Sequence, residues 1–88
     1  MAAEDFQMTL ARTMRQHREG LSVSQEGFAD SIGVHRTYYS SVERGERNVS
    51  LKNLLKIAAG LGVPLSQLIA DAERWKVTSE PKRKAKNS

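Results

Sequence analysis

Cysteine is missing from this chain altogether. Its absence excludes disulfides and thiolate metal sites, and it suits a reducing compartment. No apolar run approaches the roughly 20 residues that span a bilayer. The acidic start, Met-Ala-Ala-Glu-Asp, has neither the basic residues nor the apolar stretch of a signal peptide. We therefore expect a cytoplasmic protein with no membrane partner.

Strand signals are also scarce, because β-branched residues are sparse and no segment alternates apolar and polar residues. Apolar residues recur instead at helical spacing, and 88 residues allow one domain at most. We predict an all-α fold with five helices, over about residues 5–19, 24–32, 35–44, 51–61 and from 64 to a point between 72 and 77.

Local signals fix several details of these helices. Gly20 is expected to stop the first helix, while Ser24 and Ser50 are expected to cap the second and fourth. The first helix should bury one face, made of Phe6, Leu10, Met14 and His17. The fourth should bury another, made of Leu51, Leu54, Leu55, Ala58 and Leu61.

Positive charge is concentrated at one end of the chain. The net charge is +4, from 14 basic and 10 acidic residues, but four of the basic residues and one acidic residue lie in 79–88. Residues 1–78 therefore carry ten basic and nine acidic residues, a net of +1. We expect 79–88 to be a disordered basic tail that adds salt-sensitive contacts to nucleic acid at most. The net charge does not by itself support DNA binding by the folded part.

Residues 25–44 have the pattern of a helix-turn-helix. Ala29 is small and lies where two crossing helices would touch, and Gly33 suits the left-handed backbone of a sharp turn. In the second of these helices, Tyr39 and Val42 lie opposite an outward arc of about 140°. That arc is polar and consists of Arg36, Thr37, Ser40, Ser41 and Arg44. Arginine can pair with guanine O6 and N7, and small side chains allow close approach to a major groove.

The order and spacing of residues 8–70 resemble the Cro/repressor-type helix-turn-helix family. The matching residues are Arg18, 21–29, 33–34, 42–45, 47–51 and 61–65. The run His-Arg-Thr-Tyr at 35–38, followed by Val-Glu-Arg-Gly-Glu-Arg-Asn at 42–48, is similar to small restriction–modification controller proteins. The resemblance implies a compact, lambda-repressor-like DNA-binding domain over residues 1–78. It also implies a homodimer, formed through the fifth-helix region, on a two-fold-related site in double-stranded DNA.

The resemblance also implies roles for individual residues. Arg36, Thr37 and Ser41 take the base-reading positions, with His35 and Tyr38 as adjuncts, although Tyr38 could equally cover the edge of the core. The DNA backbone would be held by Gln25, Ser40, Arg44, Arg47 and Asn48. Arg18 and Glu43 take the positions of a structural ion pair.

Three residues depart from the family pattern. Gly27 replaces the usual Glu of a capping box, which should weaken the second helix slightly. His17 replaces a large aliphatic residue and should be partly buried. Tyr39 replaces Ile or Val and should lie in the core. Trp75 is either a lid on the core or an anchor of a dimer.

Catalysis and cofactor binding find no support in the sequence. The two histidines lie 18 residues apart, so no metal site is expected, and no phosphate loop, nucleophile elbow or acid–base pair is present. We expect no enzyme activity, no cofactor and no small-molecule ligand. The leading prediction is a sequence-specific transcription regulator. The alternatives are an antitoxin-type regulator that also grips a partner protein, and a purely protein-binding helical module.

Overall fold

A computed structural model describes residues 3–74 of the chain. Trp75 and the tail predicted at 79–88 lie outside the described residues. Within residues 3–74 the secondary structure consists of five helices and no strand, so the predicted fold class is confirmed. The helices are α1 (Ala3–Gly20), α2 (Gln25–Ile32), α3 (Arg36–Glu43), α4 (Leu51–Leu61) and an unlabelled fifth helix, described over Leu65–Arg74.

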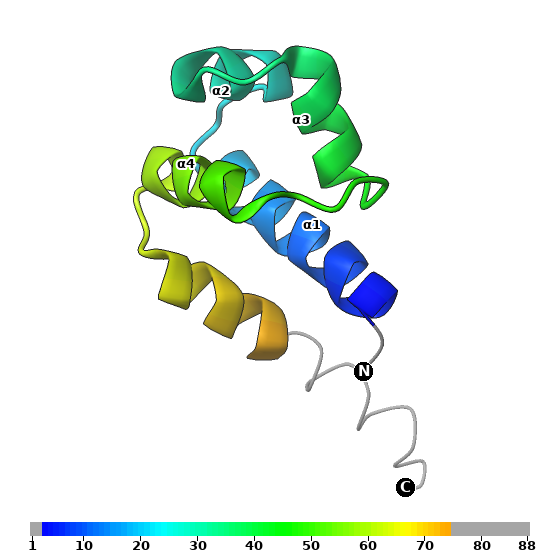
Figure 1. Cartoon of the computed structure of the whole chain (residues 1–88). Helices are drawn as coiled ribbons and strands as arrows, with labels where there is room; N and C mark the ends of the chain where they lie inside the picture. Colours follow the sequence, from blue (N-terminus) through cyan, green and yellow to red (C-terminus); the bar gives the residue numbers. More distant parts are fainter. Residues whose placement is uncertain (1–2, 75–88) are drawn as a thin grey trace, which may run out of the picture.

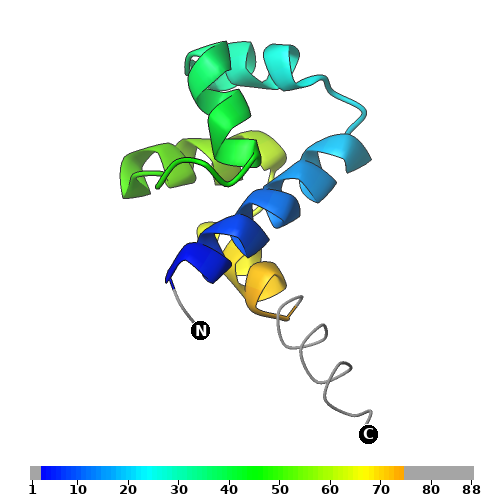
Figure 2. The same ribbon diagram turned by 90° about the vertical axis from the view of Figure 1, so that its right-hand side faces the viewer.

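The helices place α2 and α3 at one end of the molecule and the fifth helix at the other (Figure 1). α1 and α4 lie between these ends, and the view after a quarter turn keeps the same order (Figure 2). α3 contacts α1 and α2, and α4 contacts the same two helices. The helix-turn-helix therefore rests on a platform made by α1 and α4.

One small core joins all five helices. The buried apolar residues are Leu10, Ala11, Met14, Phe28, Ala29, Tyr39, Val42, Ile57, Ala58, Leu61, Leu68 and Ala72. The rings of Phe28 and Tyr39 pack with their centroids 5.2 Å apart. Tyr39 is completely buried, as predicted, and it packs the inner face of α3 against α2.

The predicted caps of α2 and α4 are confirmed. Ser24 Oγ accepts a hydrogen bond from the Gly27 amide at 3.0 Å, and Ser50 Oγ accepts one from Asn53 at 3.2 Å. These bonds satisfy amides that have no partner inside the helix. The end of α1 differs from the prediction, because Gly20 lies inside the helix and Ser22 adopts the left-handed backbone, with φ of 60°. The amides of Leu21 and Ser22 still bond carbonyls three residues back, which continues the helical path past the glycine.

The buried face of α4 is rotated from the predicted one. Leu51 and Leu55 are 64% and 51% exposed, whereas Ile57 is fully buried. Ile57, Ala58 and Leu61 fill the core contact instead, and α4 approaches α2 closely at Gly60, where an added Cβ would lie 2.5 Å from Ile32 Cγ2. The prediction for Leu51 and Leu55 was therefore wrong, and both leave apolar surface in the open.

Among residues 3–74, no single helix is long and apolar enough to cross a membrane. The one consecutive pair with enough combined apolar length, Leu51–Leu61 and Leu65–Arg74, is bent by 92°.

Candidate nucleic-acid interface

The turn between α2 and α3 is built from local backbone hydrogen bonds. Gly33 adopts the left-handed conformation, with φ of 74°, and its amide lies 3.3 Å from the carbonyl oxygen of Asp30. The next amide, that of Val34, donates to Ala29 at 3.1 Å. A residue with a Cβ is strained at such a φ, so glycine is favoured here. The turn fixes the direction in which α3 leaves α2.

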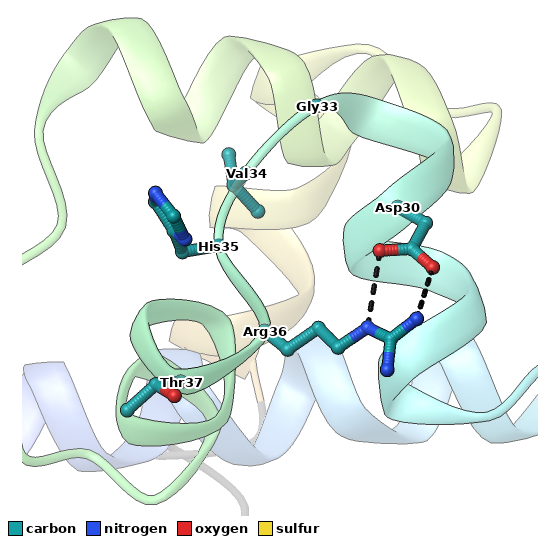
Figure 3. Close-up of a pocket in the computed structure, with 6 residues that line it drawn as sticks. All are labelled: Asp30, Gly33, Val34, His35, Arg36 and Thr37. Atoms are coloured by element: carbon teal, nitrogen blue, oxygen red, sulfur yellow. Dashed lines mark hydrogen bonds and ion pairs between the residues drawn. The ribbon is translucent and has the colours of Figure 1, made fainter.

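The start of α3 is open to solvent. His35, Arg36 and Thr37 are exposed, and His35 serves as the N-cap without a capping hydrogen bond from its ring. Together with Asp30, Gly33 and Val34 they line an open hollow of about 560 Å³ (Figure 3). Two of the three residues assigned to base reading, Arg36 and Thr37, are therefore consecutive residues on accessible surface, and their side chains point in different directions (Figure 3).

Ser41, the third of them, lies deeper. It is only 9% exposed, and its hydroxyl donates to the carbonyl oxygen of Tyr38 at 2.7 Å. It contributes to the lining of a second open hollow, of about 590 Å³, together with Thr37, Arg44, Glu46, Arg47 and Asn48. Ser41 thus offers little exposed surface to this hollow.

Arg36 is held by a carboxylate from α2. Its Nε donates to Asp30 Oδ1 at 3.2 Å and its Nη2 to Asp30 Oδ2 at 2.8 Å (Figure 3). Glu26 Oε1 lies 3.8 Å from Nη1. Arg36 donates the hydrogen bonds to Asp30, which lower the pKa of the Asp30 carboxyl and raise the pKa of the Arg36 guanidinium. Sequence spacing alone does not indicate this pair, because it joins residues six apart across a turn.

Arg44 is also paired. Its Nε and Nη2 both donate to the Glu46 carboxylate at 3.0 Å, and its Nη1 donates to Ser40 Oγ at 2.6 Å. The pKa of Glu46 is lowered, chiefly by the hydrogen bond from Arg44. Arg44 and Glu46 therefore form an exposed ion pair just past the end of α3.

Tyr38 contacts α4 through its hydroxyl group. Its hydroxyl accepts a hydrogen bond from Asn53 Nδ2 at 3.0 Å, and the Arg47 guanidinium lies 5.5 Å from its ring centroid. A cation over an aromatic face is attracted by the ring quadrupole. Tyr38 therefore links α3 to α4 and holds Arg47 beside the reading helix, while Asn48 is exposed next to it.

Beneath this surface, Glu43 accepts hydrogen bonds from three elements. Arg18 of α1 donates through Nε at 2.6 Å and Nη2 at 3.1 Å, Gln25 of α2 through Nε2 at 2.8 Å, and Tyr39 through its hydroxyl at 2.5 Å. Arg18 also donates to the carbonyl of Val23. The two residues expected to form a structural ion pair are thus in contact, and Gln25, assigned to phosphate, is drawn into the same network.

Burial shapes the ionisation of this network. Burial alone would raise the pKa of the Glu43 carboxyl, but hydrogen bonds from Arg18, Gln25 and Tyr39 outweigh it and lower that pKa. Burial, with the hydrogen bond to Glu43, raises the pKa of the Tyr39 hydroxyl. Glu43 is therefore ionised and Tyr39 neutral at neutral pH, which suits one acceptor surrounded by donors.

His17 makes a second link between distant helices. Its Nε2 lies 2.9 Å from Asp71 Oδ2, which connects α1 to the fifth helix. Gln67 and Arg74 also contact the Asp71 carboxylate. The predicted partial burial of His17 is confirmed, with a polar contact that its sequence position did not indicate. Within residues 3–74 no three His, Asp or Glu side chains are grouped closely enough to hold a metal ion.

Comparison with known proteins identifies the class. Residues 14–68 match the sequence model of the helix-turn-helix family, which is more than half of the chain. The protein therefore belongs to this family, and it is a DNA-binding transcription regulator.

The resemblance to controller proteins is confirmed by individual relatives. The chain is 58% identical over 57 residues to the control protein C.MunI from a Mycoplasma species, covering 65% of this chain and 77% of that protein. It is 42% identical over 65 residues to the control protein C.SmaI of Serratia marcescens, covering 74% and 77%. The crystal structure of the restriction-modification controller protein C.AhdI from Aeromonas hydrophila superposes with a TM-score of 0.69 at 39% identity, covering 73% of this chain and 96% of that one.

Proposed function

We propose that the protein is a sequence-specific transcription regulator that binds a two-fold-related operator as a homodimer, with α3 in the major groove. The observation that carries the proposal is the exposed start of α3, where Arg36 and Thr37 stand on a helix anchored from below by the buried Glu43 network. A helix of this kind fits the major groove, and arginine and threonine can read guanine and the thymine methyl. Acting on DNA inside a cell, the protein would work in the cytoplasm.

The base-reading set in this proposal is Arg36 and Thr37, with Ser41 at the floor of the neighbouring hollow and His35 and Tyr38 at the edges. His35 is favoured by its exposure at the helix start. Tyr38 contributes chiefly by holding Arg47, and its hydroxyl oxygen accepts a hydrogen bond from Asn53. A contact to base edges specifies sequence, whereas a contact to phosphate sets position.

Phosphate contacts are assigned to the rim of the reading helix. Arg44 and Arg47 supply charge, Ser40 and Asn48 supply polar groups, and all four flank the second hollow or its edge. Gln25 already donates to Glu43, so we assign the phosphate contact to its remaining amide hydrogen and to the first turn of α2. One bound phosphate would then touch the same network that anchors α3.

Pairing of two copies is proposed through the fifth-helix region. Supporting surface lies on α4, where Leu51 and Leu55 are exposed one helical turn apart. Exposed apolar side chains that lie together mark interaction surfaces more often than isolated ones do. A monomer would bind a half-site weakly, and coupling two half-sites about one helical turn of DNA apart would raise affinity and specificity together.

Selection of bound duplexes from a random DNA pool, at stated salt, tests this function. The proposal predicts a two-fold-related consensus and an affinity that falls as salt rises. Recovery of no consensus, with no salt-dependent binding, would instead favour a protein-binding module. Sedimentation of the free protein as a monomer at tens of micromolar would restrict the dimer to the DNA-bound state.

A further inference from the structure

Asp30 and Arg36 form an exposed ion pair with two hydrogen bonds between the carboxylate and the guanidinium. Both carboxylate oxygens are used, one by Nε and one by Nη2. The two side chains come from different helices, on either side of the turn, and remain 55% and 57% exposed. They lie in the wall of the hollow at the start of α3, on the surface assigned to DNA (Figure 3).

The contact with Asp30 determines which N–H groups of the Arg36 guanidinium are left to contact a base. A guanidinium presents its N–H groups along two usable edges, and Asp30 occupies the edge made by Nε and Nη2. The outer edge, made by Nη1 and the second hydrogen of Nη2, points away from the carboxylate (Figure 3). Two parallel N–H groups of this kind match guanine O6 and N7 in the major groove.

We propose that Asp30 is a specificity-determining positioning residue, whose carboxylate holds Arg36 side-on so that the outer edge of the guanidinium reads one guanine. The proposal rests on the function proposed above, because it needs α3 in the major groove. Arg36 is the reading group, and Asp30 acts through it.

Two physical effects favour this role. An arginine side chain loses rotamer freedom when it is fixed on a base, and a carboxylate that fixes it beforehand removes part of that cost. The same carboxylate carries negative charge toward the DNA backbone and weakens binding to every sequence. Asp30 therefore lowers non-specific affinity while it sharpens the choice at one base pair, which is how specificity is gained against competing sites.

Glu26 supplies a matched control. Its Oε1 lies 3.8 Å from Nη1, beyond hydrogen-bonding distance, and its side chain is 72% exposed. It carries the same charge on the same helix, one turn away from Asp30, without gripping the guanidinium. Removing the Glu26 charge should therefore change electrostatics near Arg36 without releasing its side chain.

The test compares wild type with Asp30→Asn, Glu26→Gln and Arg36→Ala at one fixed salt concentration. The probes are a duplex carrying the consensus selected by the wild type, the full set of its single-base-pair substitutions, and random DNA. Arg36→Ala first identifies the base pair that Arg36 reads, where preference should fall roughly 5- to 150-fold. Asp30→Asn should bind random DNA more tightly yet lose preference at that same base pair, by roughly 2- to 10-fold. Glu26→Gln should bind random DNA more tightly and keep its preference.

The outcomes separate the two proposals. Full preference at the Arg36 position in Asp30→Asn overturns the role of Asp30 and leaves the reading function standing. Loss of preference spread evenly over all positions also overturns it, because a distorted helix would produce that pattern. A wild type that selects no consensus removes the proposed function itself, and the inference with it.

Discussion

Removing the Glu43 carboxylate should destabilise the fold far more than removing any surface charge. Glu43 and Arg18 are 5% and 7% exposed, and the carboxylate accepts four hydrogen bonds. In Glu43→Ala the Arg18 guanidinium stays buried without its counter-charge, and the Tyr39 hydroxyl loses its acceptor. Breaking a buried pair by deleting one partner costs about 3–5 kcal/mol.

That cost is large for a domain of this size. Native domains are stable by only about 5–15 kcal/mol, and a small one lies at the low end. For 60–100 residues, each 1 kcal/mol moves the melting temperature by roughly 4–8 °C, so Glu43→Ala should melt about 12–40 °C below wild type. Far-UV circular dichroism during a thermal scan measures this directly.

Glu46→Ala is the matched control, because Glu46 has the same side chain and lies just beyond the end of α3. Its pair with Arg44 is exposed, at side-chain exposures of 58% and 52%, and such pairs add little to stability. Equal melting temperatures for Glu43→Ala and Glu46→Ala would show that the buried network does not stabilise the fold. Arg18→Met placed on Glu43→Ala should recover part of the loss, since it removes the unpaired charge.

Three other residues, Gly60, Arg47 and Asp71, give further expectations. Gly60→Ala would gain helix propensity of about 1 kcal/mol but must push Ile32 and Phe28 aside, at a cost of about 1–3 kcal/mol, so we expect a lower midpoint in urea unfolding. Arg47→Ala should weaken binding to all DNA sequences alike and reduce the slope of log affinity against log salt by about one, as titrations at several salt concentrations would show. The hydrogen bond from His17 lowers the pKa of the Asp71 carboxyl from its ordinary value of 3.8. The ionised carboxyl therefore stabilises the folded state above that value, and this stabilisation is lost as the pH falls through the lowered pKa. Melting of Asp71→Asn should therefore depend less on pH than melting of wild type as the pH falls below about 5.

Local sequence signals predicted the helix caps and the turn of the helix-turn-helix. Ser24, Ser50 and Gly33 act through hydrogen bonds or backbone conformations within a few residues, so their roles can be derived from sequence alone. Contacts between helices are harder to predict from the sequence. The contact of Arg18 with Glu43 was expected only through family resemblance, since 25 residues separate the two.

Other features depend on how tightly the helices approach. A helical wheel gives the direction of a side chain but not its depth, which is why Ser41 lies lower than its place on the outward arc suggested. The apolar residues of α4 allow more than one buried face, and the packing against the other helices selects the one with Ile57 and leaves Leu51 and Leu55 exposed. Asp30 had no assigned role because nothing in the sequence relates it to Arg36 until the turn brings them together.

Sequence-specific binding by this protein depends, in the proposed function, on Arg36 reading bases from α3. The most direct test measures the affinity of wild type and Arg36→Ala for the selected operator and for random DNA at the same salt concentration. We expect Arg36→Ala to lose its preference for the operator, while its binding to random DNA falls much less. Equal loss of affinity for both DNAs would contradict it, because Arg36 would then be a phosphate contact.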